Sequence, residues 1–243
     1  MCWRVTGKVL ILAGTREARL LCASCGGLDV LASLAGATEA PRDLHVPTRV
    51  GGFGGASGFV AALDGVSAVL DATHPYAAAI TRRTVRICGQ RDIPYLRLAR
   101  APFAPDWTWT RHADAGAAAD ALPSGAAVFL ATGPGTVEPF LDRGLTLHCR
   151  RIDPAPAREG VNWIVGAPPF TDSEERALLA LLGVTHLVAK DSGGDRAKLN
   201  AAGDLGIAVH IIDRPAHAGG EETHDIDQAL AFVRTHARKL ADH

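Results

Sequence analysis

Side chains that can move a proton gather in the segment DATHPY, which follows directly after the apolar, strand-like run VSAVL. Its polar members are Asp71, Thr73, His74 and Tyr76. Each can donate or accept a proton, and the proline among them suits the first turn of a helix. We predict a catalytic site at the end of this strand, with His74, Asp71 and Tyr76 as candidate groups. In the alternative reading, Thr73 caps the helix and His74 packs against the loop.

A second group of residues could hold a phosphate. The apolar run KVLILAG at 8–14 ends in Gly14, and Thr15 and Arg16 then begin a predicted helix. Backbone N–H groups at a helix N-terminus favour a phosphate, and glycine lets a ligand come close. The full GxGxxG pattern is absent because arginines occupy its later glycine positions, so an ordinary tight strand–helix turn stays an alternative.

Four of the five residues in the segment 51–55 are glycine, and Phe53 is the fifth. Such a run requires unusual backbone angles or a backbone pressed against a ligand. A flexible surface loop is the alternative, although a linker would favour serine over phenylalanine. We therefore predict that Gly52, Phe53, Gly54 and Gly55 contact a ligand.

Two later turns repeat the arrangement. Thr132 and Gly133 follow the apolar run AAVFLA, and Lys190, Ser192, Gly193 and Gly194 follow HLVA. A lysine that ends a strand beside glycines suits a phosphate or a carboxylate. Lys198, in the helix that follows, is a further candidate or simply a solvated residue.

Several chemistries lack their motifs. HExxH and a paired CxxC site are absent, so no metal-binding spacing is present, and the absence of GxSxG and of a full Walker A sequence argues against serine hydrolases and P-loop ATPases. Cys22 and Cys25 form one CxxC late in a predicted helix, where we interpret them as buried small residues. We predict no metal site.

Strand-like and helix-like segments alternate along the chain, which indicates an α/β fold with mainly parallel sheets. Predicted strands cover 8–14, 28–35, 66–72, 94–98, 126–131, 145–152, 186–190 and 208–212, and predicted helices cover 15–25, 75–91, 137–143, 172–182, 197–205 and 226–240. The Pro- and Trp-containing segment 101–109 interrupts the pattern. We therefore predict two Rossmann-like domains, 1–101 and 102–243, with a cofactor cleft between them.

Composition sets broader limits. The 243 residues carry a net charge of −1, so no strong field attracts nucleic acid or a membrane surface. Apolar runs are shorter than the roughly 18 residues that span a bilayer, and no signal peptide is evident, so we expect a cytoplasmic protein. The oligomeric state is not fixed by the sequence, and a monomer is favoured.

Taken together, these motifs resemble the precorrin-6A reductase family, including its cobalt-precorrin-6A branch. The matching segments occur in the family's order: LILAGTREA at 10–18, SLAG at 33–36, RVGGFGG at 49–55, DATHPYA at 71–77, PYLRLAR at 94–100, Thr132-Gly133, KDSGG at 190–194, AKL at 197–199, LGIAV at 205–209 and DRP at 213–215. RVGGFGG followed by DATHPYA is the specific part.

The resemblance implies that the protein reduces one double bond of a tetrapyrrole, precorrin-6A, with a reduced nicotinamide cofactor in cobalamin biosynthesis. It implies that Gly14, Thr15 and Arg16 face the pyrophosphate and that Gly52–Gly55 pass close to the cofactor. Asp71, Thr73 and His74 would lie near the nicotinamide, and residues 190–194 would close the site. Arg49, Arg97, Arg100 and Lys198 are candidates to hold substrate carboxylates.

The sequence departs from the family in two places. The family commonly has Arg after SLAG, which suits the 2′-phosphate of NADPH, whereas this chain has Ala37. Ser33, Thr38 and Arg42 are left as phosphate contacts; we favour NADPH and keep NADH open. Asp191 stands where the family often has Asn. The alternatives are a reductase of another substrate, a dinucleotide-binding module without catalysis, and an S-adenosylmethionine-dependent methyltransferase.

Overall fold

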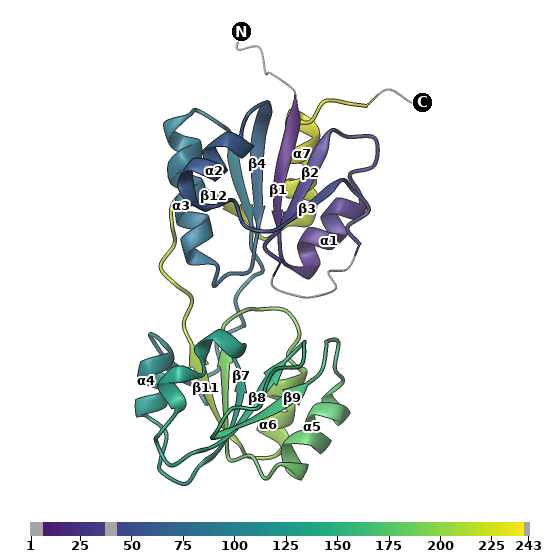
Figure 1. The fold of residues 1–243 in the computed structure, drawn as a ribbon. Coiled ribbons are helices and arrows are strands. Elements are labelled where there is room, and N and C mark those ends of the chain that lie inside the picture. The colour runs from purple at the N-terminus through teal and green to yellow at the C-terminus, as the bar shows by residue number, and fades with distance from the viewer. Residues whose placement is uncertain (1–6, 37–42, 241–243) are drawn as a thin grey trace. The chain divides into compact units, whose positions relative to one another are not determined.

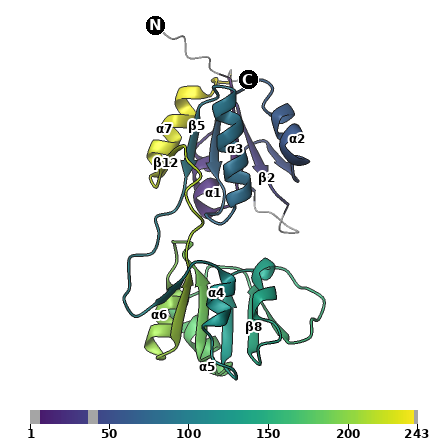
Figure 2. The same ribbon diagram turned by 90° about the vertical axis from the view of Figure 1, so that its left-hand side faces the viewer.

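A computed structural model of the chain describes residues 7–36 and 43–240. The chain forms two units. The first combines the chain up to Ala101 with the segment from Pro215 onward, and the second spans Pro102–Arg214. Two connections therefore join the units, and they can be followed in Figure 2.

The first unit is built on a six-stranded sheet in which every ladder is parallel. Its strands are β1 (Lys8–Ala13), β2 (Val30–Leu34), β3 (Thr48–Val50), β4 (Val66–Ala72), β5 (Tyr95–Leu98) and β12 (Glu221–Thr223). Their spatial order is β12-β5-β4-β1-β2-β3. The direction of winding reverses between β1 and β4, and open α/β sheets bind ligands at the carboxyl ends of the strands at such a switch point.

Helices cover both faces of this sheet (Figure 1). The helices are α1 (Arg16–Ala23), α2 (Gly55–Ala62), α3 (Ala78–Gln90) and α7 (Ile226–His236). Side chains of α1 and α7 pack with Val9, Ile11 and Leu70 on one face. Those of α2 and α3 pack with Leu10 and Leu12 on the other. Burial on both faces explains why β1 and β4 appear in the sequence as continuous apolar runs.

The second unit has its own six-stranded sheet, again with parallel ladders throughout. Its strands are β6 (Thr110–His112), β7 (Ala127–Ala131), β8 (Thr146–Arg151), β9 (Val161–Val165), β10 (His186–Lys190) and β11 (Ala208–Ile212), in the order β6-β11-β10-β7-β8-β9. Helices α5 (Asp172–Leu181) and α6 (Ala197–Asp204) pack on one face around Phe129 and Leu187. The short α4 (Ala115–Asp120) contacts β6 and β11. The two parallel sheets with interspersed helices confirm the predicted fold class.

The assignment of the chain from Pro215 onward to the second domain is wrong. β12 pairs with β5 along Glu221–Thr223, and α7 packs on β4 and β5. The last strand and helix therefore complete the first unit. Three residues form β12, and two of them are glutamates, which is too short and too polar a pattern to be recognised as a strand.

One local expectation also changes. In place of the helix predicted over 137–143, the chain forms two single-turn 3-10 helices, Pro134–Thr136 and Glu138–Phe140, each with proline in its first turn. Helix α5 is capped by Thr171, whose side chain accepts from Glu174 N–H. The reciprocal contact from Glu174 completes a capping box.

Candidate active site at the carboxyl edge of the first sheet

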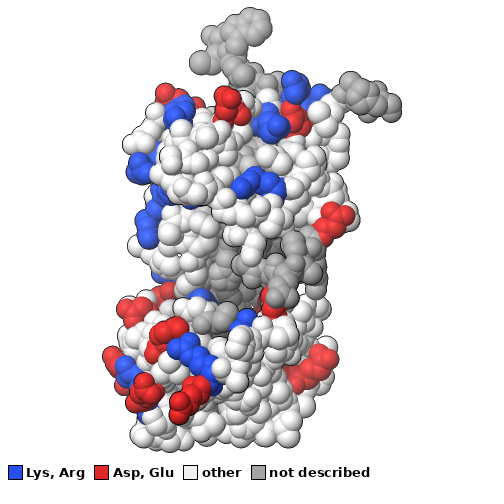
Figure 3. Space-filling view, viewed as in Figure 1, with Lys and Arg blue, Asp and Glu red and all other residues white. Residues whose placement is uncertain are grey.

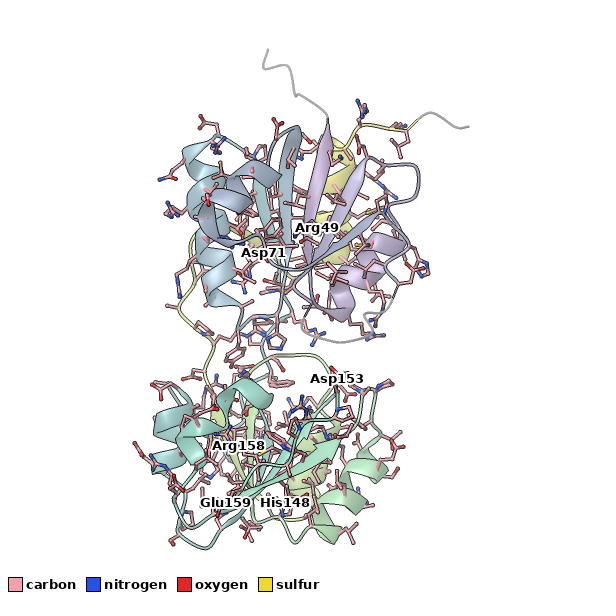
Figure 4. All side chains as sticks on the ribbon, in the orientation of Figure 1. Arg49, Asp71, His148, Asp153, Arg158 and Glu159 are labelled. Carbon is pink, nitrogen blue, oxygen red and sulfur yellow. The ribbon has the colours of Figure 1, made fainter. Side chains whose placement is uncertain are left out.

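One layer of side chains crosses all six strands of the first sheet near their carboxyl ends. The register aligns Arg49 with Ser33, Ser33 with Leu12, Leu12 with Asp71, Asp71 with Arg97, and Arg97 with Glu222. Register partners in a parallel sheet point to the same face. Figure 4 labels Arg49 and Asp71 at this end of the sheet. The sheet thus gathers five polar side chains that are far apart in the sequence.

Asp71 is fully buried, and its carboxylate organises the turn that follows β4. One oxygen accepts from the Thr73 N–H (3.1 Å) and from the Thr73 hydroxyl (2.6 Å). The other accepts from the Tyr95 hydroxyl at 3.1 Å. Burial and the adjacent Asp71 raise the pKa of Tyr95, so the phenol keeps its proton and donates it. Both oxygens thus accept from groups within the first unit, which favours a positioning role over the predicted catalytic one.

The half-buried His74 follows the turn that Asp71 holds. Its ring Nδ1 accepts from the Tyr76 N–H at 3.3 Å, and the two rings lie 5.7 Å apart. An acceptor at Nδ1 places the proton of the neutral ring on Nε2. The backbone of residues 73–74 also lies beside Gly14, because a Cβ on Gly14 would stand 3.8 Å from Thr73 Cα and 3.9 Å from His74 N. The predicted catalytic turn and the predicted phosphate turn are therefore neighbours.

Thr15 ties these two turns together. Its hydroxyl donates to Ala72 O at the end of β4 and accepts from the Ala18 N–H, which caps α1, both at 3.1 Å. The first backbone N–H groups of a helix have no intrahelical acceptor, so those of Arg16 and Glu17 point toward the carboxyl edge. Arg16 is exposed there. The Glu17 carboxylate pairs with Arg100 at 2.5 Å, which offsets its negative charge.

Arg49 holds the glycine-rich loop after β3. Its guanidinium donates to Ser33 Oγ (2.8 Å), Gly51 O (3.0 Å) and Gly52 O (3.0 Å), and it stacks over the Phe53 ring at 4.1 Å. Gly51, Gly54 and Gly55 have left-handed φ values of 112°, 69° and 94°, a conformation that favours glycine. The predicted contacts in this loop are thus part of an ordered structure that turns into α2.

One arginine prediction needs correction. Arg97 is only 8% exposed, lies 3.6 Å from Glu222 and donates to Pro75 O at 3.4 Å, so it joins β5 to β12. Its side chain is only 10% exposed, which argues against the predicted substrate contact. Arg83 on α3 is half-buried and stacks over Phe59 (4.6 Å) and Phe53 (5.5 Å). Arg82 and Arg86 are exposed, and Figure 3 shows basic side chains along the α3 side of the first unit.

In the second unit, the predicted residues lie at the carboxyl ends of β7 and β10. The Thr132 hydroxyl is buried and hydrogen-bonded to Thr136 at 2.7 Å. Gly133, Gly193 and Gly194 adopt left-handed φ values of 83°, 67° and 81°. Lys190 is half-buried, and this burial lowers the pKa of its ammonium group. Ser192 and Lys198 are half-buried. Their contact with a cofactor or substrate stays a prediction.

Asp191 has a clear structural role. Its carboxylate accepts from the Phe103 N–H at 2.9 Å and from Arg111 at 2.7 Å, and its carbonyl accepts from Arg214 at 2.7 Å. Arg111 also pairs with Asp213. The residue thus anchors both chain connections where they enter the second unit. Sequence reasoning missed Arg111 because the cation and the carboxylate are 80 residues apart.

Other predictions concern the rest of the chain. Ala37, Thr38 and Arg42 lie outside the described residues. Cys22 and Cys25 are buried, and desolvation raises their pKa values to about 12 and about 11, which confirms them as core residues.

Within 7–36 and 43–240, no helix is long and apolar enough to cross a membrane, and no cluster of His, Cys, Asp or Glu side chains could hold a metal ion. A pocket of about 370 Å³ lies at the opposite, amino end of β5 and β12, beside Tyr95 and Glu221.

Comparisons with known proteins agree with this arrangement. The family profile described as "Precorrin-6x reductase CbiJ/CobK" matches residues 8–234. The precorrin-6A reductase of Rhodococcus erythropolis is 38% identical over 250 residues, covering 96% of this chain and 99% of its own length. That of Rhodobacter capsulatus is 36% identical over 247 residues, covering 94% and 96%.

The fold comparison points the same way. A solved structure described as "CobK precorrin-6A reductase" superposes with a TM-score of 0.88 at 35% identity, covering 95% of this chain and 97% of the other. The sequence resemblance is thereby confirmed over nearly the whole length. The chain belongs to the precorrin-6x reductase (CbiJ/CobK) family, a family of oxidoreductases of cobalamin biosynthesis.

Proposed function

We propose that this protein reduces one double bond of the precorrin-6A macrocycle to give precorrin-6B, with NADPH as the hydride donor. The observation that carries the proposal is the family match across residues 8–234. The relatives at 36% and 38% identity are named precorrin-6A reductase. The fold supports it, because Gly14 and the turn at 73–74 flank the switch point of the first sheet.

The residues at this switch point fit a dinucleotide. Gly14 has no left-handed φ, and a Cβ there would make only ordinary van der Waals contacts. Neither backbone conformation nor packing therefore demands glycine, which leaves close approach by a ligand as the physical reason. The N–H groups of Arg16 and Glu17 and the exposed Arg16 side chain supply donors and positive charge for a pyrophosphate.

When bound, the reduced nicotinamide supplies the hydride, and the protein orients the reactants and manages the proton. Thr15 fixes, through its two hydrogen bonds, the strand–helix turn that would bind the pyrophosphate. Asp71 fixes Thr73 and so sets the direction of the chain into His74. Asp71 is a positioning residue in this proposal, since its carboxylate is buried below the turn.

His74 is the proposed proton donor. Since Nδ1 accepts from the Tyr76 backbone, the proton of the neutral ring is at Nε2, where it can be donated to substrate or to a bound water. Tyr76 contributes its backbone N–H to this arrangement, and we assign its side chain no separate proton transfer. Arg100 and Lys198 stay candidates to bind substrate carboxylates, and Arg97 is withdrawn because Glu222 and Pro75 occupy it.

The experiment is to add precorrin-6A to the protein with NADPH, and separately with NADH, and to follow the loss of reduced-nicotinamide absorbance. We expect oxidation that requires the tetrapyrrole and is faster with NADPH. Binding of NADPH without any oxidation would contradict the proposal and identify a reductase of another substrate or a binding module.

A matched pair of variants tests the role of His74. We expect His74→Gln to lower kcat by about 100-fold, within the range for loss of a general acid. His45→Gln changes an exposed histidine of the same unit and should keep full activity. Full turnover by His74→Gln would remove the proton-donor role and leave the reductase proposal intact.

A further inference from the structure

The hydrogen bond between Arg49 and Ser33 joins the last parts of β3 and β2. The two residues are register partners, and Arg49 donates to Ser33 Oγ at 2.8 Å. Ser33 is the penultimate residue of β2 and is 5% exposed. Figure 4 shows Arg49 at the same end of the sheet as Asp71. The pair therefore lies at the carboxyl edge that the proposed cofactor site uses.

The Arg49 cation is held in one orientation. Its two bonds to Gly51 O and Gly52 O and its stacking on Phe53 restrain the guanidinium on three sides. A guanidinium has five donors, and these three hydrogen bonds use three of them. A side chain fixed before binding loses little rotamer entropy when a ligand arrives. Arg49 is thus preorganised to donate to an anion.

The charge at this position favours a phosphate over a hydroxyl. In dinucleotide sites that select NADH, an acidic residue at the end of the second strand accepts from the ribose 2′-hydroxyl. Here the segment 31–36, from within β2 to the glycine beyond it, contains no acidic residue. It offers a serine hydroxyl with an arginine beside it, and arginine matches the geometry of a phosphate monoester.

The glycine-rich loop and the end of β2 are joined at the same place. Gly51 N–H donates to Leu34 O at 2.9 Å, so the glycine-rich loop is tied to the end of β2. Gly36 has a left-handed φ of 78° and lies beside Val50, a residue that is 56% exposed at the end of β3. An exposed apolar side chain beside a glycine suits the flat face of a nucleobase.

We propose that the Arg49–Ser33 pair binds the 2′-phosphate of the cofactor's adenosine and selects NADPH over NADH. The proposal rests on the proposed function and deepens it, since it concerns the cofactor of the same site. It moves Arg49 from the predicted substrate contacts to the cofactor. It also places the cation for the 2′-phosphate on β3. This chain has Ala37 at the position after SLAG where the family usually has Arg.

The test is calorimetric titration of the full chain with 2′,5′-ADP and with 5′-AMP, which differ only in the 2′-phosphate. We expect 2′,5′-ADP to bind wild type at least about 10-fold more tightly. Arg49→Gln should weaken 2′,5′-ADP binding about 10- to 100-fold and change 5′-AMP binding less than about 3-fold, since a charge-assisted contact is worth roughly 1.5–3 kcal/mol. Ser33→Ala should weaken 2′,5′-ADP alone, by a few-fold.

Two further variants separate recognition from loop anchoring. Arg49→Lys retains the charge and should recover part of the preference for 2′,5′-ADP, even if Arg49→Gln proves unstable. Arg83→Gln removes the other cation stacked on Phe53, from α3, and should leave the preference unchanged. Thermal unfolding of each variant reports whether the first unit is intact.

The outcomes are distinct. Equal loss of both nucleotides in Arg49→Gln and Arg49→Lys would make Arg49 a loop anchor only and overturn the proposal. Equal binding of both nucleotides by wild type would overturn it too, while the cofactor site itself would stand. Binding of neither nucleotide, together with no oxidation of NADPH or NADH, would instead contradict the proposed function.

Discussion

The carboxylate of Asp71 lies 2.6 Å from the hydroxyl of Thr73 and accepts from it, although the two residues are only two apart in the sequence. The bond holds the chain in its turn between β4 and His74. Because Asp71 also accepts from Tyr95, one buried carboxylate connects the strand, the turn and the neighbouring β5. The turn that leads into His74 is therefore held by a buried carboxylate, which is not exposed at the surface of the site.

Asp71→Asn and Asp71→Ala should separate support from catalysis. An asparagine keeps an acceptor for Thr73 and can donate to the Tyr95 oxygen, so we expect kcat to fall less than about 10-fold. The alanine leaves buried donors without an acceptor and should cost about 2–4 kcal/mol of unfolding free energy, with a larger loss of turnover. Steady-state kinetics and thermal unfolding measure both effects. An asparagine variant with normal stability and no turnover would show that the carboxylate itself takes part in the reaction.

Position 58 has no room for a side chain because it faces the glycine-rich loop. A Cβ at this position would stand 1.6 Å from Phe53 O, so even alanine must displace the backbone of the glycine-rich loop. We expect Gly58→Ala to raise the Kd for NADPH by at least about 10-fold.

The control for Gly58 is Gly89→Ala, in α3, where a Cβ has no atom within 4 Å. That change should leave the Kd for NADPH unchanged and add a few tenths of a kcal/mol of stability, because alanine is the better helix former. Unchanged cofactor binding in Gly58→Ala would mean that the loop does not contact the cofactor.

The pair Asp191–Arg111 should be strongly coupled. The Asp191 side chain is 4% exposed and that of Arg111 is 43% exposed. Removing the cation leaves a buried charge poorly compensated, so Arg111→Gln should cost about 1–3 kcal/mol. In an Asp191→Asn background the same change should cost less than about 0.5 kcal/mol. Thermal unfolding of the four proteins gives the coupling energy.

An ion pair on the surface provides the comparison for this double-mutant cycle of Asp191 and Arg111. Arg176 and Asp204 contact one another with both side chains 52% exposed, and Arg176→Gln should cost less than about 0.5 kcal/mol. Additive effects at Asp191 and Arg111 would contradict the anchoring role that we assign to Asp191.

A row of histidines in the second unit should make its stability fall in acid. His210 on β11 lies 2.9 Å from His112 and stacks near His186. Burial, with the repulsion of these two rings, lowers the pKa of His210 to about 4. An unfolded histidine titrates near 6.5, so the unfolded chain binds a proton between these values and the folded chain does not.

The stabilising effect of neutral His210 is therefore complete above pH 6.5 and is lost as pH falls toward 4, at most by about 3 kcal/mol. Thermal unfolding from pH 7 to pH 4 should show a smaller decline for His210→Gln than for wild type. His217→Gln changes an exposed histidine and should not alter the slope. Identical pH dependence in all three proteins would contradict the predicted shift.

Much of the fold follows from local sequence because both sheets are buried on both faces. Strands β4, β10 and β11 occupy the residues predicted for them, since a buried parallel strand is a continuous apolar run. The three-residue strands β3, β6 and β12 have no such run. They were not predicted because their place depends on a neighbouring strand that is remote in the sequence.

The sequence by itself determined the family, the α/β alternation and the turns that end the strands, since glycine, proline and capping residues act on the backbone next to them. The tertiary structure decided which polar side chains serve the fold. Asp71, Arg97 and Asp191 look equally available in the sequence, yet Tyr95, Glu222 and Arg111 occupy them. Buried charge requires a partner, and only the sheet register brings together partners that are 24 to 125 residues apart.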